Sequence, residues 1–262
     1  MKISVVVVEY HSLDEVSCCI KAFKESIPTV EIIISSNSQY TTEQRQQIIS
    51  AIPDCKWCFN ERNGGFAYAM NEGLKIATGD YLIISNPDCI IENGIEDMAR
   101  FLSRHPEIGA IAPRITDKFG NLQDSYREYI TLPNFIGRQF QRILKREEVV
   151  LDKGIDYNKI QTVDWVIGAF IMVPRHIYEK TGGLSLDYFM YVEDMDWCTR
   201  IRKCGYEIVY YPKASIIYEG SRKARKSLKF AFIFFKSLMT YWRKFGFYMT
   251  SPQRTKSTYK ES

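Results

Sequence analysis

The sequence contains no run of about 20 consecutive apolar residues, the length that a helix needs to cross a lipid bilayer. The opening residues, MKISVVVVEY, are too short for a signal sequence, and no cleavage-like ending follows them. We therefore expect a cytoplasmic protein. The seven cysteines are odd in number and scattered, which argues against a disulfide framework and indicates reduced thiols.

The familiar phosphate-binding loops are missing too. Gly64 and Gly65 precede an expected helix and expose bare backbone that an anion or a ribose can approach, but they form neither G-x-G-x-x-G nor a loop ending in G-K-[ST]. Cys55 and Cys58 have C-x-x-C spacing without a second pair, so a zinc or redox site is the less favoured interpretation.

Acidic residues are absent from residues 220–260, which contain eleven lysines and arginines. The rest of the chain has 24 basic and 31 acidic residues, although the net charge of the whole is +4. The positive charge therefore belongs to the C-terminal region. It predicts an anionic surface as the partner of that region, and no nucleic acid at the body of the protein.

The same region contains an amphipathic pattern. In SLKFAFIFFKSLMTYWRKF (227–245), apolar residues recur with the 3, 4, 7 spacing of one helix face, and lysines and arginines lie beside them. Two interpretations remain open: a helix lying in a membrane interface, or a helix packed on the domain with a solvated basic face. We predict a domain at 1–220 and a basic amphipathic helix and tail at 221–262.

Short β-branched segments alternate with helical segments through most of the chain, which predicts an α/β fold with a mostly parallel, doubly wound sheet. Ligands of such sheets bind at the carboxyl ends of the strands. Residues 117–160 have weak periodicity and are predicted to be a long insertion that covers a site. Strands are expected at 3–10, 30–35, 55–60, 80–85, 108–115, 163–175 and 206–212, and helices at 14–26, 42–51, 90–106, from Gly65, and up to Cys204.

Two acidic segments are candidates for chemistry. In SNPDCII (85–91), Asp88 follows a buried strand in a turn fixed by Pro87, where a carboxylate suits a hard divalent cation. The alternative is an Asx turn that caps nearby backbone amides.

The second segment, FMYVEDMDWCTR (189–200), places Glu193, Asp194 and Asp196 within four positions beside aromatic residues. Burial and like charge raise a carboxylate pKa toward the range that suits a general base. The alternative is a helix start, with Asp194 as its cap and Asp196 paired with Arg200 four residues later.

In order and spacing, these segments resemble the family-2 glycosyltransferases with a GT-A fold, within them the rhamnosyltransferase-like branch, over roughly residues 2–245. The pair formed by Asn-Pro-Asp and, about a hundred residues later, Glu-Asp-x-Asp is the most specific feature. The resemblance rests on ISVVVVEYHS, EIIISSNS, NGGFAYAMNEGLKIATGDYLIISNPD, VDWVIGAFIMVPR, GGLSLDYFMYVEDMDWCTRIRKCGY and IIYEGSRKARKS.

The resemblance implies an inverting transfer of a sugar, rhamnose-like or hexose, from a dTDP- or UDP-linked donor to a hydroxyl of a saccharide acceptor. It further implies a polyprenyl-linked acceptor, surface polysaccharide synthesis, and a peripheral location at the inner face of the cell membrane.

The resemblance also assigns residues. Asp88 is implied to bind Mg²⁺ or Mn²⁺ against the donor diphosphate, and Asp194 to be the catalytic base, with Glu193 and Asp196 orienting the acceptor or tuning that base. Trp165 is implied to form an apolar wall for a sugar face. The implied nucleotide-binding positions are Tyr10, Ser36, Asn37, Asn63, Gly65, Asn71 and Asn86.

Three positions depart from the family pattern. Glu9-Tyr10-His11 stands where Thr-Tyr-Asn is frequent, Ser36 where an aspartate contacts the nucleoside, and Tyr218 where relatives commonly have a metal-binding histidine. A phenol is a poor metal ligand, so Tyr218 is expected either to hold metal weakly or to hydrogen-bond the diphosphate. These departures leave open a degenerate glycosyltransferase fold that serves as a membrane-associated binding or assembly subunit. A sugar-nucleotide pyrophosphorylase is disfavoured, because no Gly-rich basic loop follows the first strand.

Overall fold

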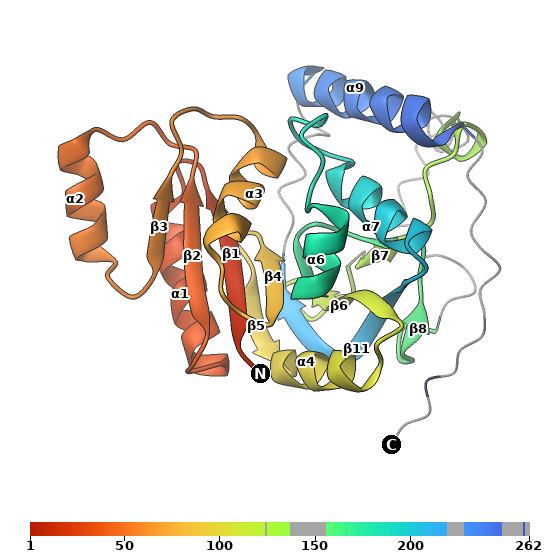
Figure 1. Ribbon diagram of the computed structural model, residues 1–262, viewed down its shortest axis with the longest axis horizontal. Coiled ribbons are helices and arrows are strands. Elements are labelled where there is room, and N and C mark those ends of the chain that lie inside the picture. The colour runs from red at the N-terminus through yellow and green to blue at the C-terminus, as the bar shows by residue number, and fades with distance from the viewer. Residues whose placement is uncertain (124, 137–155, 219–227, 248–258, 260–262) are drawn as a thin grey trace.

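The computed structural model describes residues 1–123, 125–136, 156–218, 228–247 and Tyr259, and Figure 1 shows their arrangement. Part of the predicted insertion (124 and 137–155) and the whole of the basic stretch SRKARK (221–226) lie outside the described residues.

The first half of the central sheet consists of parallel strands in the order β3-β2-β1-β4. Their valines and isoleucines are buried on both faces, as in a sheet covered by helices on each side. All four strands therefore end at one edge, which is where the candidate site residues are concentrated. The strands are β1 (Ile3–Glu9), β2 (Glu31–Ser36), β3 (Lys56–Phe59) and β4 (Tyr81–Ser85).

The second half of the sheet contains both strand directions. β10 (Phe170–Pro174) runs antiparallel to both β4 and β6 (Ile108–Thr116), and β11 (Glu207–Ile217) is parallel to β6. Because β10 is reversed, its first residue pairs with Ser85, the last residue of β4. The residues that precede β10 therefore lie at the same edge as the Asn-Pro-Asp turn.

Helices cover both faces of this sheet. Successive side chains along each strand point to opposite faces, and they pack into two separate cores. Val5 and Val7 pack with α1 (Leu13–Ser26) and α4 (Ile95–Arg104). Val6 and Val8 belong to the other core, which includes residues of α3 (Phe66–Ile76), α6 (Arg175–Thr181) and α7 (Glu193–Lys203). Helix α2 (Thr42–Ala51) lies beyond β3 at the end of the sheet (Figure 1).

The structure corrects three predicted boundaries. The predicted helix 90–106 begins as strand β5 (Ile90–Asn93), which pairs with β11, and the helix starts only after Gly94. Gly94 has φ +76, and a Cβ there would approach Lys213 O to 2.6 Å, so this turn requires glycine.

The predicted strand 163–175 is two strands, β9 (Trp165–Val166) and β10, separated by a break at Gly168. β9 pairs with the short β7 (Tyr126–Arg127) of the predicted insertion. The predicted strand 206–212 extends to Ile217, and its first half also pairs with β8 (Gln161–Thr162).

Helix α9 (Leu228–Phe245) packs on the domain through its second half and exposes large apolar side chains in its first half. In its second half, Leu238, Tyr241 and Trp242 are buried in the core that contains α7. In its first half, the large apolar side chains of Leu228 and Phe232 are 91% and 69% exposed. Among the described residues, no helix is both long and apolar enough to cross a membrane.

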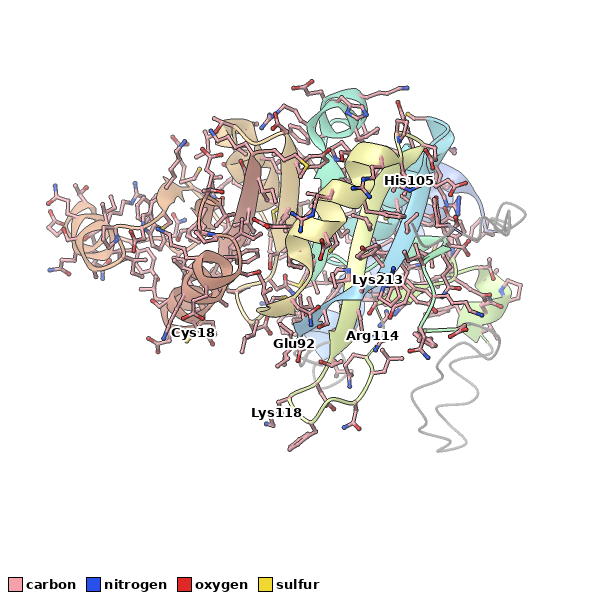
Figure 2. All side chains as sticks on the ribbon, turned by 90° about the horizontal axis from the view of Figure 1, so that it is seen from below. Cys18, Glu92, His105, Arg114, Lys118 and Lys213 are labelled. Atoms are coloured by element: carbon pink, nitrogen blue, oxygen red, sulfur yellow. The ribbon has the colours of Figure 1, made fainter. Side chains whose placement is uncertain are left out.

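Figure 2 shows the molecule from below, turned by 90° from the view of Figure 1. His105 lies at the end of α4, and Lys118 projects with the turn after β6.

Candidate functional site

Two hydrogen bonds, each donated by a backbone N–H group, bring the distant acidic segments together. Asn86 N–H donates to Ala169 O at 2.9 Å, which fixes the Asn-Pro-Asp turn against the start of β10. Gly168, the residue before Ala169, donates its N–H to Asp194 Oδ2 at 2.7 Å. The turn that carries Asp88 and the helix that carries Asp194 are therefore joined through two consecutive residues.

Glu193 and Asp194 have unlike surroundings. Glu193 is buried, and its Oε2 has no hydrogen-bond partner among the residues that the structure describes. Burial and the neighbouring Asp194 charge raise the pKa of Glu193 from an ordinary 4.5 to about 8. Glu193 is therefore the member of the pair that holds a proton at neutral pH.

Asp194 is half-buried and accepts two backbone N–H groups, from Gly168 and, at 2.8 Å, from Met195. Burial raises its pKa, while these hydrogen bonds and the nearby charge of Arg127 oppose that rise. The negative charge of the pair therefore belongs on Asp194, as a general base requires.

The backbone that leads into α7 is unusual. Tyr191 and Val192 have φ values of +71 and +73, just before the acidic pair. A β-branched residue such as valine rarely adopts this left-handed conformation, because it costs on the order of 1–3 kcal/mol. Surrounding contacts must therefore hold this turn in place.

Asp196 serves the structure of α7. Its carboxylate is fully buried and pairs with Arg200 at 2.5 Å and with Lys244 Nζ at 2.8 Å, and Tyr188 OH donates to it at 3.0 Å. The predicted Asp196–Arg200 ion pair is confirmed. With these partners, Asp196 is not exposed to an acceptor.

Asp88 is exposed at the end of the turn, and Tyr218 follows β11 at the same edge. Asn86 Nδ2 donates to Tyr218 Oη at 2.9 Å, and burial together with the Asp88 charge raises the pKa of the phenol well above its ordinary value. Tyr218 is therefore a neutral hydroxyl, which can donate its own proton in a hydrogen bond.

The fit to a divalent cation rests on this donor set. Within the described ranges, no three His, Cys, Asp or Glu side chains gather as a metal-binding group. Mg²⁺ and Mn²⁺ nevertheless bind to one or two protein carboxylates when substrate phosphates supply further oxygens. One exposed carboxylate at Asp88 fits that mode, whereas the protonated Tyr218 is suited to hydrogen-bonding a phosphate.

At the ends of β1 and β2, a buried carboxylate organises hydroxyl groups. Glu9 Oε2 accepts from Ser36 Oγ at 2.5 Å, and Glu9 Oε1 accepts from Ser38 Oγ at 3.1 Å. Ser36 and Glu9 have no exposed surface, so Ser36 supports this edge of the sheet from the interior. Tyr10 and Asn63 are exposed at the edge.

Asn37 is also enclosed: it donates to Gly65 O at 3.0 Å and accepts from Asn60 Nδ2 at 3.1 Å. Asn71, predicted to contact nucleotide, uses both ends of its amide on the backbone of Leu184, at 2.7 and 3.0 Å. It therefore connects α3 to the chain that precedes α7.

Gly65 permits a close contact between the same two regions. Its φ is +90, and a Cβ would lie only 2.0 Å from Phe189 O. Trp165 is buried at 4% exposure and donates to Glu128 O at 3.0 Å, so the structure places its ring in the core and not along a sugar face.

Two residues beside Asp194 were not predicted. An isolated glycine in a strand pattern, as at Gly168, indicates a break or a close backbone approach, and this signal was available in the sequence. Arg127, whose guanidinium also lies 5.8 Å from the Trp165 ring centroid, comes from the insertion, which gave no periodic pattern.

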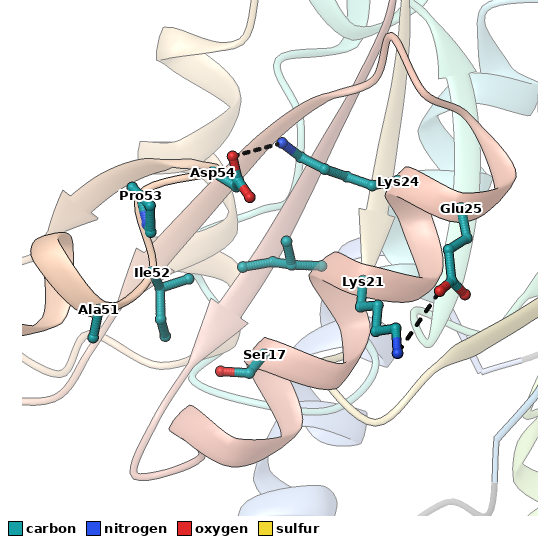
Figure 3. Close-up of a pocket in the computed structure, with 9 residues that line it drawn as sticks. Ser17, Lys21, Lys24, Glu25, Ala51, Ile52, Pro53 and Asp54 are labelled. Carbon is teal, nitrogen blue, oxygen red and sulfur yellow. Dashed lines mark ion pairs between the residues drawn. The ribbon is translucent and has the colours of Figure 1, made fainter.

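A pocket of about 420 Å³ lies elsewhere, between α1 and residues 51–54 (Figure 3). Lys24 and Asp54 pair across it at 3.2 Å, and it contains none of the predicted site residues. All seven cysteines are free thiols, and burial raises the pKa of Cys55 to about 12, which disfavours a redox role for C-x-x-C.

Comparison with known proteins gives relatives at moderate identity. The chain is 29% identical over 208 residues to an N-acetylglucosaminyl-diphospho-decaprenol L-rhamnosyltransferase of Mycobacterium tuberculosis, a match that covers 72% of this chain and 66% of the relative. It is 26% identical to rhamnosyltransferase WbbL of Escherichia coli, over 66% of this chain and 65% of that protein. The chain thus spans just under two thirds of the length of these relatives.

Solved structures share the fold. A mannosyltransferase from Pyrobaculum calidifontis superposes with a TM-score of 0.62 at 16% identity, covering 96% of this chain and 66% of that one. GalNAc-T7 gives 0.63 at 16% identity, over 84% of this chain and 44% of that one. These neighbours confirm the predicted α/β architecture of the GT-A type.

The family model described as glycosyl transferase family 2 matches residues 4–181, which include the parallel strands, the Asn-Pro-Asp turn and β10. With this match and the rhamnosyltransferase relatives, the chain belongs to glycosyl transferase family 2 and is rhamnosyltransferase-like.

Proposed function

We propose that the protein is an inverting glycosyltransferase that moves a rhamnose-like sugar or a hexose from a dTDP- or UDP-linked donor to a hydroxyl of a saccharide acceptor. The names of the relatives support a lipid-linked saccharide as acceptor and rhamnose as the sugar. The product would enter surface polysaccharide synthesis at the cytoplasmic face of the membrane.

The observation that carries this proposal is the placement of Asp194, which accepts two backbone N–H groups, beside the turn that holds Asp88. In the proposed reaction, the ionised Asp194 takes the proton of the acceptor hydroxyl as its oxygen attacks the anomeric carbon. Glu193, holding a proton, keeps a second negative charge away from the attacking oxygen.

Asp88 would hold Mg²⁺ or Mn²⁺ against the donor diphosphate. The two solved neighbours contain Mn²⁺ with a nucleotide or a nucleotide sugar, which supports a divalent ion in this fold. Such an ion stabilises the charge that builds on the leaving diphosphate. The neutral Tyr218 hydroxyl, held by Asn86, would donate a hydrogen bond to a phosphate oxygen.

The exposed half of α9 would attach the enzyme to an anionic membrane. Leu228, Phe232 and Phe235 are exposed there, with Lys229 and Lys236 on the same half of the helix. Apolar rings that enter the headgroup region next to cations that face anionic lipid are the usual composition of an interfacial helix.

The test is a thermal-shift and hydrolysis panel of dTDP-, UDP- and GDP-sugars, with and without Mn²⁺. One donor should raise the melting temperature in the presence of Mn²⁺, because a ligand that binds only the folded state stabilises it. That donor should also be hydrolysed slowly with water as the acceptor. Failure to bind any nucleotide would favour the alternative, a degenerate fold that serves as a membrane-associated assembly subunit.

A further inference from the structure

The C-terminal helix α9 contacts α7, the helix that carries Asp194, through one polar face. Ser237, Tyr241 and Lys244 are four and three positions apart, so they lie on the same side of α9. All three make polar contacts with α7 or with the segment that leads into it. This helix lies outside residues 4–181, the part of the chain that the family model matches.

Lys244 makes the most extensive of these contacts. Its Nζ lies 2.8 Å from Asp196 Oδ2 in α7, 3.4 Å from Asp187 Oδ2 and 3.3 Å from Ser185 Oγ. Lys244 therefore bridges α7 and the beginning of the segment 185–192. Its side chain is 33% exposed, whereas that of Asp196 is fully buried.

Ser237 holds the far end of the same segment by donating to Met190 O at 2.8 Å. Tyr241 shares a hydrogen bond of 2.8 Å with Thr199 in the middle of α7. The ring of Phe234, also on α9, lies 6.0 Å from that of Tyr191. The segment 185–192 is thus attached to α9 along most of its length.

The other side of the segment is attached to α3. Phe66 N–H donates to Phe189 O at 2.8 Å. Asn71 donates to the backbone of Leu184, the residue just before the segment begins. Between these two supports, the segment ends in the left-handed residues Tyr191 and Val192. That conformation persists only where surrounding contacts enforce it, and it sets the position of the first turn of α7.

We propose that α9 is a positioning element of the catalytic site, with Lys244 as the positioning residue that fixes the segment 185–192 and, through it, Asp194. The inference rests on the proposed role of Asp194 as the base. Without Lys244, the buried Asp196 loses one of its two cations and the segment loses its anchor to α9. The first turn of α7 then shifts relative to Gly168.

The test compares Lys244→Gln with Arg243→Gln, which removes an equal charge from the adjacent, exposed position of the same helix. Turnover is measured as Mn²⁺-dependent hydrolysis of dTDP-rhamnose and UDP-glucose in solution, without vesicles. Lys244→Gln should lower kcat at least about tenfold and leave the donor KM within about twofold, because displaced reacting groups cost rate more than binding. Arg243→Gln should match the unaltered protein, and Lys244→Arg should recover most of the rate.

Amide hydrogen exchange on the same proteins provides a readout that is independent of turnover. Lys244→Gln should accelerate exchange in residues 185–192 and leave the β1–β4 strands unchanged. A kcat equal to that of the unaltered protein, or exchange in 185–192 that does not change, overturns the inference. If the unaltered protein hydrolyses neither donor, the proposed function fails on these probes, and the exchange result alone decides whether α9 holds the segment.

Discussion

At the scale of single residues, Glu193 and Asp194 show how two adjacent carboxyls acquire different protonation states. Asp194 accepts two backbone N–H groups and lies near the positive charge of Arg127, whereas Glu193 is buried and one of its oxygens has no hydrogen-bond partner in the described part of the chain. The sequence predicted the acidic cluster and its raised pKa. It could not tell which acid keeps the proton, since that depends on Gly168 and Arg127, which are distant in the chain.

Glu193→Gln should therefore change how stability depends on pH. The pKa of Glu193 is raised in the folded state, so the contribution of this one group to stability is fully present below the ordinary value of 4.5 and is lost as pH rises from there toward about 8. Urea unfolding should show Glu193→Gln to be more stable than the unaltered protein at pH 8 and nearly equal at pH 4.5. An equal difference at both pH values would contradict the raised pKa.

Tyr218→His should strengthen Mn²⁺ binding in the presence of UDP, by roughly tenfold, because it replaces a phenol with a neutral imidazole. The phenol stays protonated in the native protein, since burial and Asp88 raise its pKa. Calorimetric titration of Mn²⁺ would measure the change. Tyr218→Phe is the control: it removes the hydroxyl held by Asn86 without supplying a ligand, so it should bind Mn²⁺ no better than tyrosine does. If histidine performs no better than phenylalanine, residue 218 does not face the cation.

At the scale of elements, the strands and helices of the first 85 residues follow their sequence pattern, because buried β-branched runs and amphipathic helices alternate regularly. The pattern fails where pairing partners are distant. Residues 90–93 form an edge strand only because β11 lies beside them, and Trp165–Val166 turns away from β10 to pair with Tyr126–Arg127. Neither partner could be identified from local periodicity.

Helix α9 is divided into a packed half and an exposed half, and this division supports a prediction about the exposed half. Phe232→Ser should weaken binding to vesicles that contain phosphatidylglycerol by about tenfold, because it removes a large apolar group from the proposed lipid-facing surface. Vesicle co-sedimentation measures the effect. Phe119→Ser is the matched control, since Phe119 is 78% exposed in the turn after β6 and is not part of α9. Equal loss in both variants, or no loss in either, would rule out this surface.

At the scale of the whole molecule, the fold brings together residues that are about a hundred positions apart. The reversal of β10 places Gly168 and Ala169 at the carboxyl edge of the parallel strands, where they bind the Asp88 turn on one side and Asp194 on the other. Family resemblance predicted that these acids act together. The hydrogen-bonded residues that join them, and the attachment of α9 to α7, became apparent only from the structure.

The most direct measurement is donor hydrolysis by Asp194→Asn, with calorimetric binding of the same nucleotide sugar in the presence of Mn²⁺. Asp194→Asn should bind the donor within about twofold of the unaltered protein and hydrolyse it about 10²- to 10⁴-fold more slowly, as expected when a general base is lost. Asp88→Asn, measured alongside, should lose the Mn²⁺-dependent part of donor binding. A normal hydrolysis rate in Asp194→Asn would contradict the account.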